Sequence, residues 1–315
     1  MENNKLKENI ELPINDVLSY SRIDVFKQCP YRYKLKYIDK NYTNTTSLAL
    51  QIGTLAHYCM EMKYSGMPIN DILTGLEVGF KNNNEVIKGL NELIEEYPFE
   101  FYEVNEKSGM SVEDKIKILN NKLKNEITDE DWEVIGLEKE FEIVFNNKAR
   151  IKGFIDRIDK NKKTGEIRVI DYKTNNKEYD KKDLATPLQM YIYSLACYEM
   201  YGIYPSECIY DMLFLDVKQK GGTKGFLDRG FKALNKILDS MIYYQELGSN
   251  YLQPKPSPLC AWCPFSVTNP NSDPWYNNLC EYYSLWTREN KTFKVNKTWQ
   301  SLILENENNE IEGWD

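Results

Sequence analysis

The segment from Gly153 to Thr174, GFIDRIDKNKKTGEIRVIDYKT, places the tightest constraint on the fold. Apolar and polar residues alternate on both sides of the turn-rich sequence NKKTG, which predicts two antiparallel strands joined as a hairpin. A turn centred near residues 163 and 164 puts Asp156 opposite Asp171, with Lys173 one step further along the same face. Opposed Cβ atoms lie ~5 Å apart in such a pair, so the two carboxylates repel each other unless a positive charge lies between them.

Two acids and a lysine are costly among the apolar residues of a purely structural strand. A divalent cation bound by both carboxylates would remove the repulsion, and oxygen ligands suit such a cation. The lysine would then orient a water molecule or hold a phosphate, and metal-assisted phosphodiester hydrolysis needs this set of groups. An exposed hairpin with ordinary solvated charges is the alternative, because so short a pattern also arises by chance.

The remaining patterns predict a mixed α/β chain. Residues 48–64 form an amphipathic helix, and mostly helical patterns continue to about residue 127. Later strands are predicted at Ile135–Phe145, Ala149–Asp159, Glu166–Lys173 and Cys208–Val217, and later helices at Leu184–Tyr201 and Phe231–Glu246. The resulting fold is a small mixed sheet flanked by helices, with an N-terminal helical insertion.

Two helix pairs are further candidates for the site. His57 is the only histidine, and Glu61 follows it by one helical turn. Gln189 and Tyr193 have the same spacing on the helix after the hairpin. Taken alone, such pairs are more typical of helix packing than of a functional site.

Charge and hydropathy exclude some classes of protein. The chain has 40 Lys and Arg against 48 Asp and Glu, a net charge of −8, so it is no globally basic nucleic-acid coat. Residues 148–182 nevertheless hold twelve bases and six acids, and residues 216–236 hold six bases and two acids, so a phosphate backbone could bind there. No apolar run reaches the ~18–20 residues of a membrane span, and the N-terminus lacks the apolar stretch of a signal peptide. We therefore expect a cytoplasmic protein.

Seven cysteines without a secretory signal argue against a disulfide framework. Cys260 and Cys263 form a CxxC between two prolines, Cys280 follows after sixteen residues, and Cys29 also precedes a proline. A single CxxC is typical of a zinc half-site or of a chance pair of thiols. Four thiolates gathered from distant segments suit an iron–sulfur cluster or a four-cysteine zinc site.

Four motifs together resemble a known family. Gly53-x-x-x-His57, Gly153-Phe-Ile-Asp156, Asp171-Tyr-Lys173 and Gln189-x-x-x-Tyr193 occur in the order seen in RecB-type nucleases of the PD-(D/E)XK superfamily. The stretch SYSRIDVFKQCPYRYKLKYI is similar to the N-terminal signature of their iron–sulfur branch, which includes AddB-type recombination nucleases and CRISPR-adaptation exonucleases. The resemblance covers roughly residues 19–285. It implies a restriction-endonuclease-like core and a metal-dependent DNA exonuclease acting on free ends or single strands, in recombination or repair.

The resemblance also assigns roles by position. It implies that His57, Asp156, Asp171 and the backbone carbonyl of Tyr172 bind Mg²⁺ or Mn²⁺. It makes Lys173 the catalytic lysine, with Gln189 and Tyr193 contacting DNA or ordering the site. Ile155 replaces the usual proline and Asp171 the usual glutamate, both of which this branch tolerates.

In the iron–sulfur branch, one N-terminal cysteine and three C-terminal cysteines hold a 4Fe–4S cluster that joins the two ends of the core. Cys29, Cys260, Cys263 and Cys280 match this layout, although the gap before Cys280 is unusually long. Zinc in the same four-cysteine site is the alternative.

The expected organisation has five parts. They are a flexible N-terminus (1–18), an N-terminal helical region (19–134), the nuclease core (135–253), a cysteine-rich iron–sulfur segment (254–285) and a C-terminal segment with an acidic tail (286–315). The chain contains no GxxxxGK[ST] phosphate loop, so any helicase would be a separate partner.

Two other functions stay open. One is a non-catalytic DNA-binding or assembly subunit with the same fold, against which the joint presence of the site residues argues. The other is a zinc-stabilised adaptor, which metal analysis would separate from a nuclease. The Lys-, Asn- and Tyr-rich composition suits an AT-rich bacterium or its phage.

Overall fold

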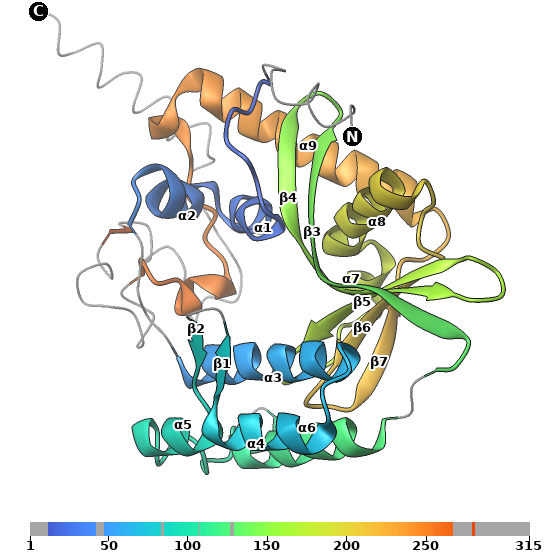
Figure 1. Ribbon diagram of the computed structural model, residues 1–315. Coiled ribbons are helices and arrows are strands. Elements are labelled where there is room, and N and C mark those ends of the chain that lie inside the picture. The colour runs from blue at the N-terminus through green and yellow to red at the C-terminus, as the bar shows by residue number, and fades with distance from the viewer. Residues whose placement is uncertain are drawn as a thin grey trace, which may run out of the picture. The chain divides into compact units, whose positions relative to one another are not determined.

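A computed structural model describes residues 12–41, 47–82, 85–106, 108–126, 129–266 and 279–280 (Figure 1). Its contacts divide the chain into two compact units. The first combines Met1–Asp24 with Thr46–Glu246, and the second combines Val25–Thr45 with Leu247–Asp315. The predicted C-terminal segment with its acidic tail, and most of the insert before Cys280, lie outside the described residues.

The first unit is built on a five-stranded mixed sheet. Its strands are neighbours in chain order: β3 (Trp132–Phe145), β4 (Ala149–Asn161), β5 (Ile167–Lys173), β6 (Glu207–Met212) and β7 (Val217–Gly221). β5 and β6 are parallel and the other neighbouring pairs are antiparallel, which confirms the predicted mixed sheet. The single strand predicted at Cys208–Val217 is instead two strands, because the chain turns back at Asp216, whose φ is 51°.

Helices cover both faces of this sheet. Ile170 and Tyr172 of β5 belong to the hydrophobic core shared with α3 (Leu48–Tyr64) and α6 (Val112–Asn125). The alternate residues of β5 face α8 (Leu188–Tyr201), which lies on the other side of the strands (Figure 1). The helix predicted at Leu184–Tyr201 is therefore shorter. Pro187 separates α8 from α7 (Lys181–Ala185), because the residue before a proline disfavours the helical conformation.

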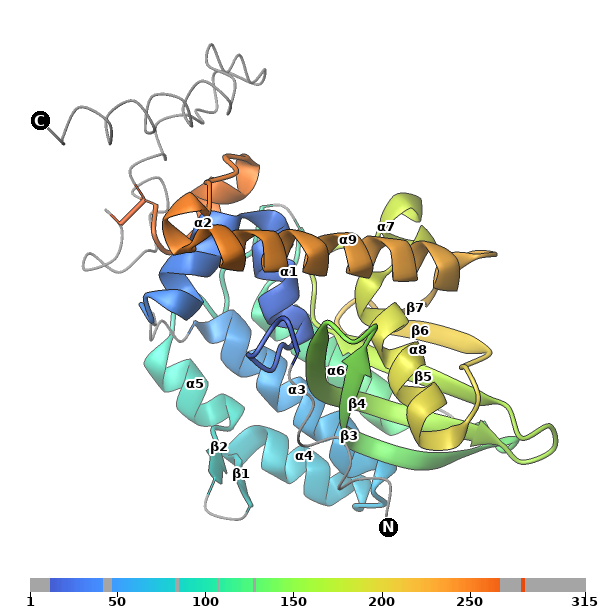
Figure 2. The same ribbon diagram turned by 90° about the horizontal axis from the view of Figure 1, so that it is seen from above.

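The helical insertion contains the predicted helices and one short hairpin that was not predicted. Between α4 (Ile69–Val78) and α5 (Leu90–Glu96), β1 (Phe80–Asn82) pairs with β2 (Glu85–Ile87). The last long helix of the chain, α9 (Phe226–Leu247), crosses α8 closely (Figure 2). At this crossing a Cβ on Gly230 would lie 2.4 Å from the Tyr191 ring, so only glycine fits there.

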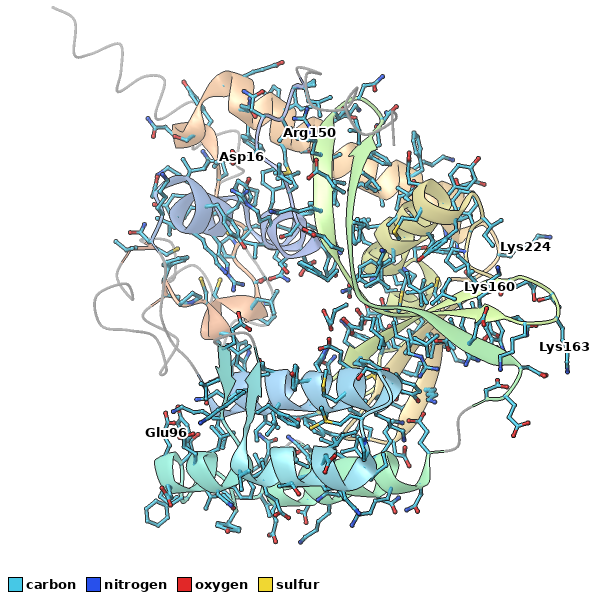
Figure 3. The ribbon with its side chains drawn as sticks, viewed as in Figure 1. Asp16, Glu96, Arg150, Lys160, Lys163 and Lys224 are labelled. Carbon is cyan, nitrogen blue, oxygen red and sulfur yellow. The ribbon has the colours of Figure 1, made fainter. Side chains whose placement is uncertain are left out.

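The N-terminal stretch that we predicted to be flexible is packed where the structure describes it. Leu12, Ile14 and Leu18 are buried, and Leu18 forms a bridge with Ile151 of β4. The Leu18 N–H donates to the Arg150 carbonyl at 2.9 Å, close to Asp16 (Figure 3). This apolar stretch therefore extends the core beside the start of β4.

The second unit consists of short elements. α1 (Tyr20–Gln28) enters it, followed by α2 (Pro30–Tyr33) and the π-helical turn η1 (Lys34–Ile38). Pro30 is the first residue of α2, and Cys29 separates α2 from α1. The 3-10 turns η2 (Ser249–Tyr251) and η3 (Pro258–Trp262) come from the other end of the chain. The Tyr31 N–H donates to the Gln253 carbonyl at 3.2 Å, so the two distant segments pair directly.

Within the described ranges, no helix is both long and apolar enough to cross a membrane.

Candidate functional site

Two aspartates meet at the end of the β4–β5 ladder. The last pair of the ladder is Arg157 with Ile170, and Asp156 and Asp171 are the next residues in the same register, as the hairpin predicts. The Tyr172 N–H donates to Asp156 Oδ2 at 2.6 Å. The side chain of Asp171 is only 2% exposed and that of Asp156 12%, so both carboxylates are largely withdrawn from water.

The protein balances only part of the charge on these carboxylates. Burial raises the pKa of Asp156 well above its ordinary value, and the nearby Asp171 raises it further. The hydrogen bond from the Tyr172 backbone opposes this shift without cancelling it. This is the repulsion that the sequence pattern predicts, in a place where a cation would relieve it.

His57 lies on α3, beside the aspartates. Its Nδ1 is 3.6 Å from Asp156 Oδ2, and its ring packs edge-on against Tyr172 with the centroids 5.9 Å apart. Burial lowers the pKa of His57 below its ordinary value. The imidazole is therefore neutral at physiological pH, which is the form that binds a metal ion.

Glu138, near the middle of β3, is a candidate ligand that the sequence analysis missed. Single ligand atoms of His57, Glu138 and Asp156 all lie within 4.8 Å of one another. The neighbours of Glu138 pair with Arg157 and Ile155 of β4, so Glu138 stands opposite Asp156. The turn at residues 146–148 fixes this register and is the sequence signal that would have revealed Glu138.

The backbone and the charge of Glu138 are both unusual. Its φ is 40°, a left-handed conformation that is uncommon for a residue other than glycine. Burial raises the pKa of the Glu138 carboxyl, and Glu61 and Asp171 add to the shift. Glu61, one turn after His57 on α3, thus contributes negative charge to the site.

A hydrogen-bonded chain leads from Asp171 to α8. Lys173 Nζ lies 2.5 Å from Asp171 Oδ2 and donates to Gln189 Oε1 at 2.9 Å. Gln189 Nε2 in turn contacts the Tyr193 hydroxyl at 2.9 Å. Although burial alone lowers the pKa of Lys173, the adjacent Asp171 outweighs it and raises the pKa above the ordinary value. The lysine is therefore held charged beside the carboxylates.

The basic hairpin tip does not belong to this site. Lys160 and Lys163 lie toward the far end of the β4–β5 hairpin (Figure 3). Lys163 is seven residues from Asp156, about 23 Å along an extended strand. It forms an ion pair of 2.7 Å with Asp131. Much of the positive charge of residues 148–182 therefore lies away from the carboxylates.

The second unit contains the four cysteines of the predicted cluster. Cys29, Cys260, Cys263 and Cys280 all line one cavity, together with Arg32. Cys29 begins α2, Cys260 lies in η3 and Cys263 ends it. The Cys280 N–H donates to the Phe265 carbonyl at 3.0 Å. The fold thus gathers thiols from both ends of the chain.

Backbone amides point at these sulfurs. Cys29 Sγ accepts from the N–H groups of Lys255 at 3.3 Å and Arg32 at 3.5 Å, and Cys260 Sγ accepts from Ser257 at 3.4 Å. Burial raises the pKa of the Cys260 and Cys263 thiols, whereas backbone hydrogen bonds and the Arg32 charge oppose that shift. The donors favour thiolates, which are the metal-binding form. Cys59, Cys197 and Cys208 are buried elsewhere, in the first unit.

Comparison with known proteins agrees with this architecture. The sequence profile of the PD-(D/E)XK nuclease superfamily matches residues 17–268, and the chain belongs to this superfamily. It is also similar to a subunit of the ATP-dependent helicase/deoxyribonuclease of Clostridium perfringens strains SM101 and ATCC 13124, with 26% identity over 221 residues in each case. These matches cover 60% of this chain but only 18% of the relatives, so the chain spans a small part of their length.

Proposed function

We propose that this chain is a divalent-cation-dependent deoxyribonuclease that degrades DNA strands from a free end. The observation that carries the proposal is the joint placement of Asp156, Asp171 and Lys173 in a chain of the PD-(D/E)XK nuclease superfamily. Two buried acids beside a charged lysine are the groups that phosphodiester hydrolysis requires. The preference for DNA ends rests on the resemblance to RecB-type exonucleases.

The donor atoms of the site fit Mg²⁺ or Mn²⁺. His57, Asp156, Asp171 and the Tyr172 carbonyl would hold the cation, and Glu138 adds a further carboxylate. One neutral imidazole among several oxygens suits Mn²⁺, and carboxylates and carbonyls suit Mg²⁺. A bound cation would lower the pKa of a water molecule and offset the negative charge that develops on the phosphate.

Lys173, with Gln189 and Tyr193 hydrogen-bonded behind it, would stabilise the charge that develops on the phosphate. Lys173 can donate a proton in a hydrogen bond to a phosphate oxygen, where it stabilises developing charge. Gln189 fixes the ammonium group from the α8 side, and Tyr193 orients Gln189. Asp171 keeps the lysine protonated and close to the cation site.

The test is digestion of linear and covalently closed single-stranded DNA with Mn²⁺, with Mg²⁺ and with chelator. We expect metal-dependent loss of the linear strand and survival of the circle, and no cleavage by Asp171→Asn. Cleavage of the circle would contradict the end requirement. Absence of metal-dependent cleavage by the wild-type chain would instead favour a DNA-binding subunit.

We also propose that Cys29, Cys260, Cys263 and Cys280 hold a 4Fe–4S cluster. Their shared cavity, the amide donors aimed at the sulfurs and the Arg32 charge support this assignment, because the cluster with four thiolates is anionic. A reducing compartment such as the cytoplasm would keep these cysteines from forming disulfides. Anaerobic purification followed by iron, sulfide and zinc analysis separates the cluster from zinc.

A partner is proposed from the relatives alone. Their name joins helicase and deoxyribonuclease activities, and this chain is similar to a small part of them. We infer that a separate helicase or recombination protein supplies unwound strands to the nuclease.

A further inference from the structure

Lys115 is a buried cation that the proposed mechanism does not use. It lies in the first turn of α6 and is only 9% exposed. Its Nζ donates to the side-chain oxygen of Asn176, which is a neutral group. Among the described residues, no carboxylate lies within 4.0 Å of Lys115 Nζ, and burial alone accounts for the lowered pKa of this lysine.

The other buried lysine of α6 shows how the chain compensates such a charge. Lys122, about two turns further along the same helix, lies 3.0 Å from Asp211 and 3.2 Å from Asp216. Its pKa is raised despite burial, because these carboxylates stabilise the ammonium form. A buried ammonium group without an anion nearby is unfavourable. Binding of an anion beside Lys115 would therefore stabilise its charged form.

The position of Lys115 connects it to the hydrolytic site. Asn176 follows Lys173 by three residues, which is at most about 11 Å of extended chain. The loop that contains it runs from Thr174 to Asp180, and its first four residues, Thr174-Asn-Asn-Lys177, include no acid. Thr174 also lies against α3, because a Cβ on Gly53 would be 3.3 Å from its hydroxyl oxygen. Gly53 is one turn before His57, so the loop contacts α3 one turn from the candidate metal ligand and contacts α6 at Lys115.

We propose that Lys115 and Asn176 form an anion site that holds a backbone phosphate of the DNA strand next to the phosphate being hydrolysed. The proposal rests on the proposed nuclease function and names a second contact with the same substrate. The ammonium group would pair with the phosphate oxygens, while the exposed Asn176 amide would donate from the other side. Because both groups contact the backbone, they would bind every sequence equally and would place the strand relative to Lys173.

The test measures binding of a labelled phosphorothioate single strand, which resists hydrolysis, to the full chain in Mg²⁺ at several salt concentrations. We expect Lys115→Met to weaken binding about tenfold, as for one charge-assisted hydrogen bond. We also expect the slope of log K against log salt to decrease by about 0.7, as for one phosphate contact. Lys115→Arg keeps the charge and should bind nearly as tightly as the wild type. The control is Lys117→Gln on the same helix, since Lys117 is exposed and pairs with Glu113.

A second variant keeps the test valid if Lys115→Met folds poorly. Asn176→Asp puts a carboxylate against Lys115, so it should raise the melting temperature while weakening DNA binding. A stabilised Asn176→Asp chain that binds the strand as tightly as the wild type would overturn the proposal. That result would leave the proposed nuclease function intact as long as the wild-type chain cleaves DNA. A wild-type chain that neither binds nor cleaves DNA would instead contradict the proposed function itself.

Discussion

At the scale of single residues, the site is a cluster of acids with too little positive charge. Four acids interact with one another in the site, and Lys173 is the lysine beside them: Glu61, Glu138, Asp156 and Asp171. Burial lowers the pKa of His57, so the imidazole stays neutral. Such an excess of buried carboxylate opposes folding when no cation is present. The sensitivity of the chain to pH and to metal should therefore originate here.

The first prediction concerns the pH dependence of stability without metal. In the folded state the pKa of Asp156 lies well above its ordinary value of 3.8. Between these two pKa values the native state binds more protons than the unfolded state, so stability falls as pH rises through that window. We expect the free energy of unfolding of chelated protein to decrease from mildly acidic to neutral pH, and Mn²⁺ to remove the decrease. Urea denaturation of the wild type and of Asp156→Asn at several pH values measures this free energy. An equally steep decrease in Asp156→Asn would show that Asp156 is not the cause.

The second prediction separates stability from metal binding at Glu138. Its φ of 40° suits glycine, and its carboxylate adds repulsion. Glu138→Gly should therefore stabilise the metal-free chain by about 1 kcal/mol while weakening its affinity for Mn²⁺. The control is Glu140→Gly, at an exposed position of the same strand, which should lose about 0.5–1 kcal/mol. Calorimetric titration and thermal melts give both quantities, and unchanged Mn²⁺ affinity in Glu138→Gly would remove Glu138 from the ligand set.

At the scale of elements, the β4–β5 hairpin was predictable because its turn is local. The turn residues fix the register, and with it the approach of Asp156 to Asp171. Glu138 was missed because its position depends on a second register, between β3 and β4, and on a backbone conformation that strand periodicity does not encode. The close approach of α9 to α8 depends on tertiary packing, which the helical pattern of either segment does not contain.

The third prediction tests that helix crossing. In a free helix, alanine is more favourable than glycine by about 1 kcal/mol. At Gly230, however, a Cβ would lie 2.4 Å from the Tyr191 ring. We expect Gly230→Ala to destabilise the chain by about 1–3 kcal/mol, because the overpacking exceeds the gain in propensity. Lys236→Ala, at an exposed position of the same helix, serves as the control, and a stabilised Gly230→Ala chain would mean that the helices are further apart.

At the scale of the whole molecule, the superfamily and the mixed sheet followed from ordered motifs, whereas the division into units did not. The N- and C-terminal cysteines fall into one unit that is discontinuous in sequence, and this pairing depends on contacts more than two hundred residues apart. Lys115 and Asn176 likewise meet only in the folded chain. The ordered motifs identified the two aspartates and the lysine of the hairpin together with His57 and Gln189 from two helices, but Glu138 and Lys115 belong to no motif and were not identified.

The fourth prediction concerns the four thiols. Because metal–thiolate bonds form only in the folded state, their free energy stabilises the segments that they join. Cys29→Ala should lose most of its iron, which we expect at about four ions per wild-type chain, and should melt at a lower temperature. Cys59→Ala, which removes a buried thiol of the first unit, should keep its iron. Full iron content and an unchanged melting temperature in Cys29→Ala would argue against the cluster.

The most direct test of the hydrolytic site is the single-turnover rate of DNA cleavage by Lys173→Ala at saturating Mn²⁺. We predict that this variant binds Mn²⁺ like the wild type but cleaves at least about 100-fold more slowly, the usual effect of removing one group that stabilises developing charge. Lys177→Ala, which alters an exposed lysine in the loop after β5, should cleave at nearly the wild-type rate. Cleavage by Lys173→Ala at the wild-type rate would contradict the assignment of this site as the hydrolytic centre.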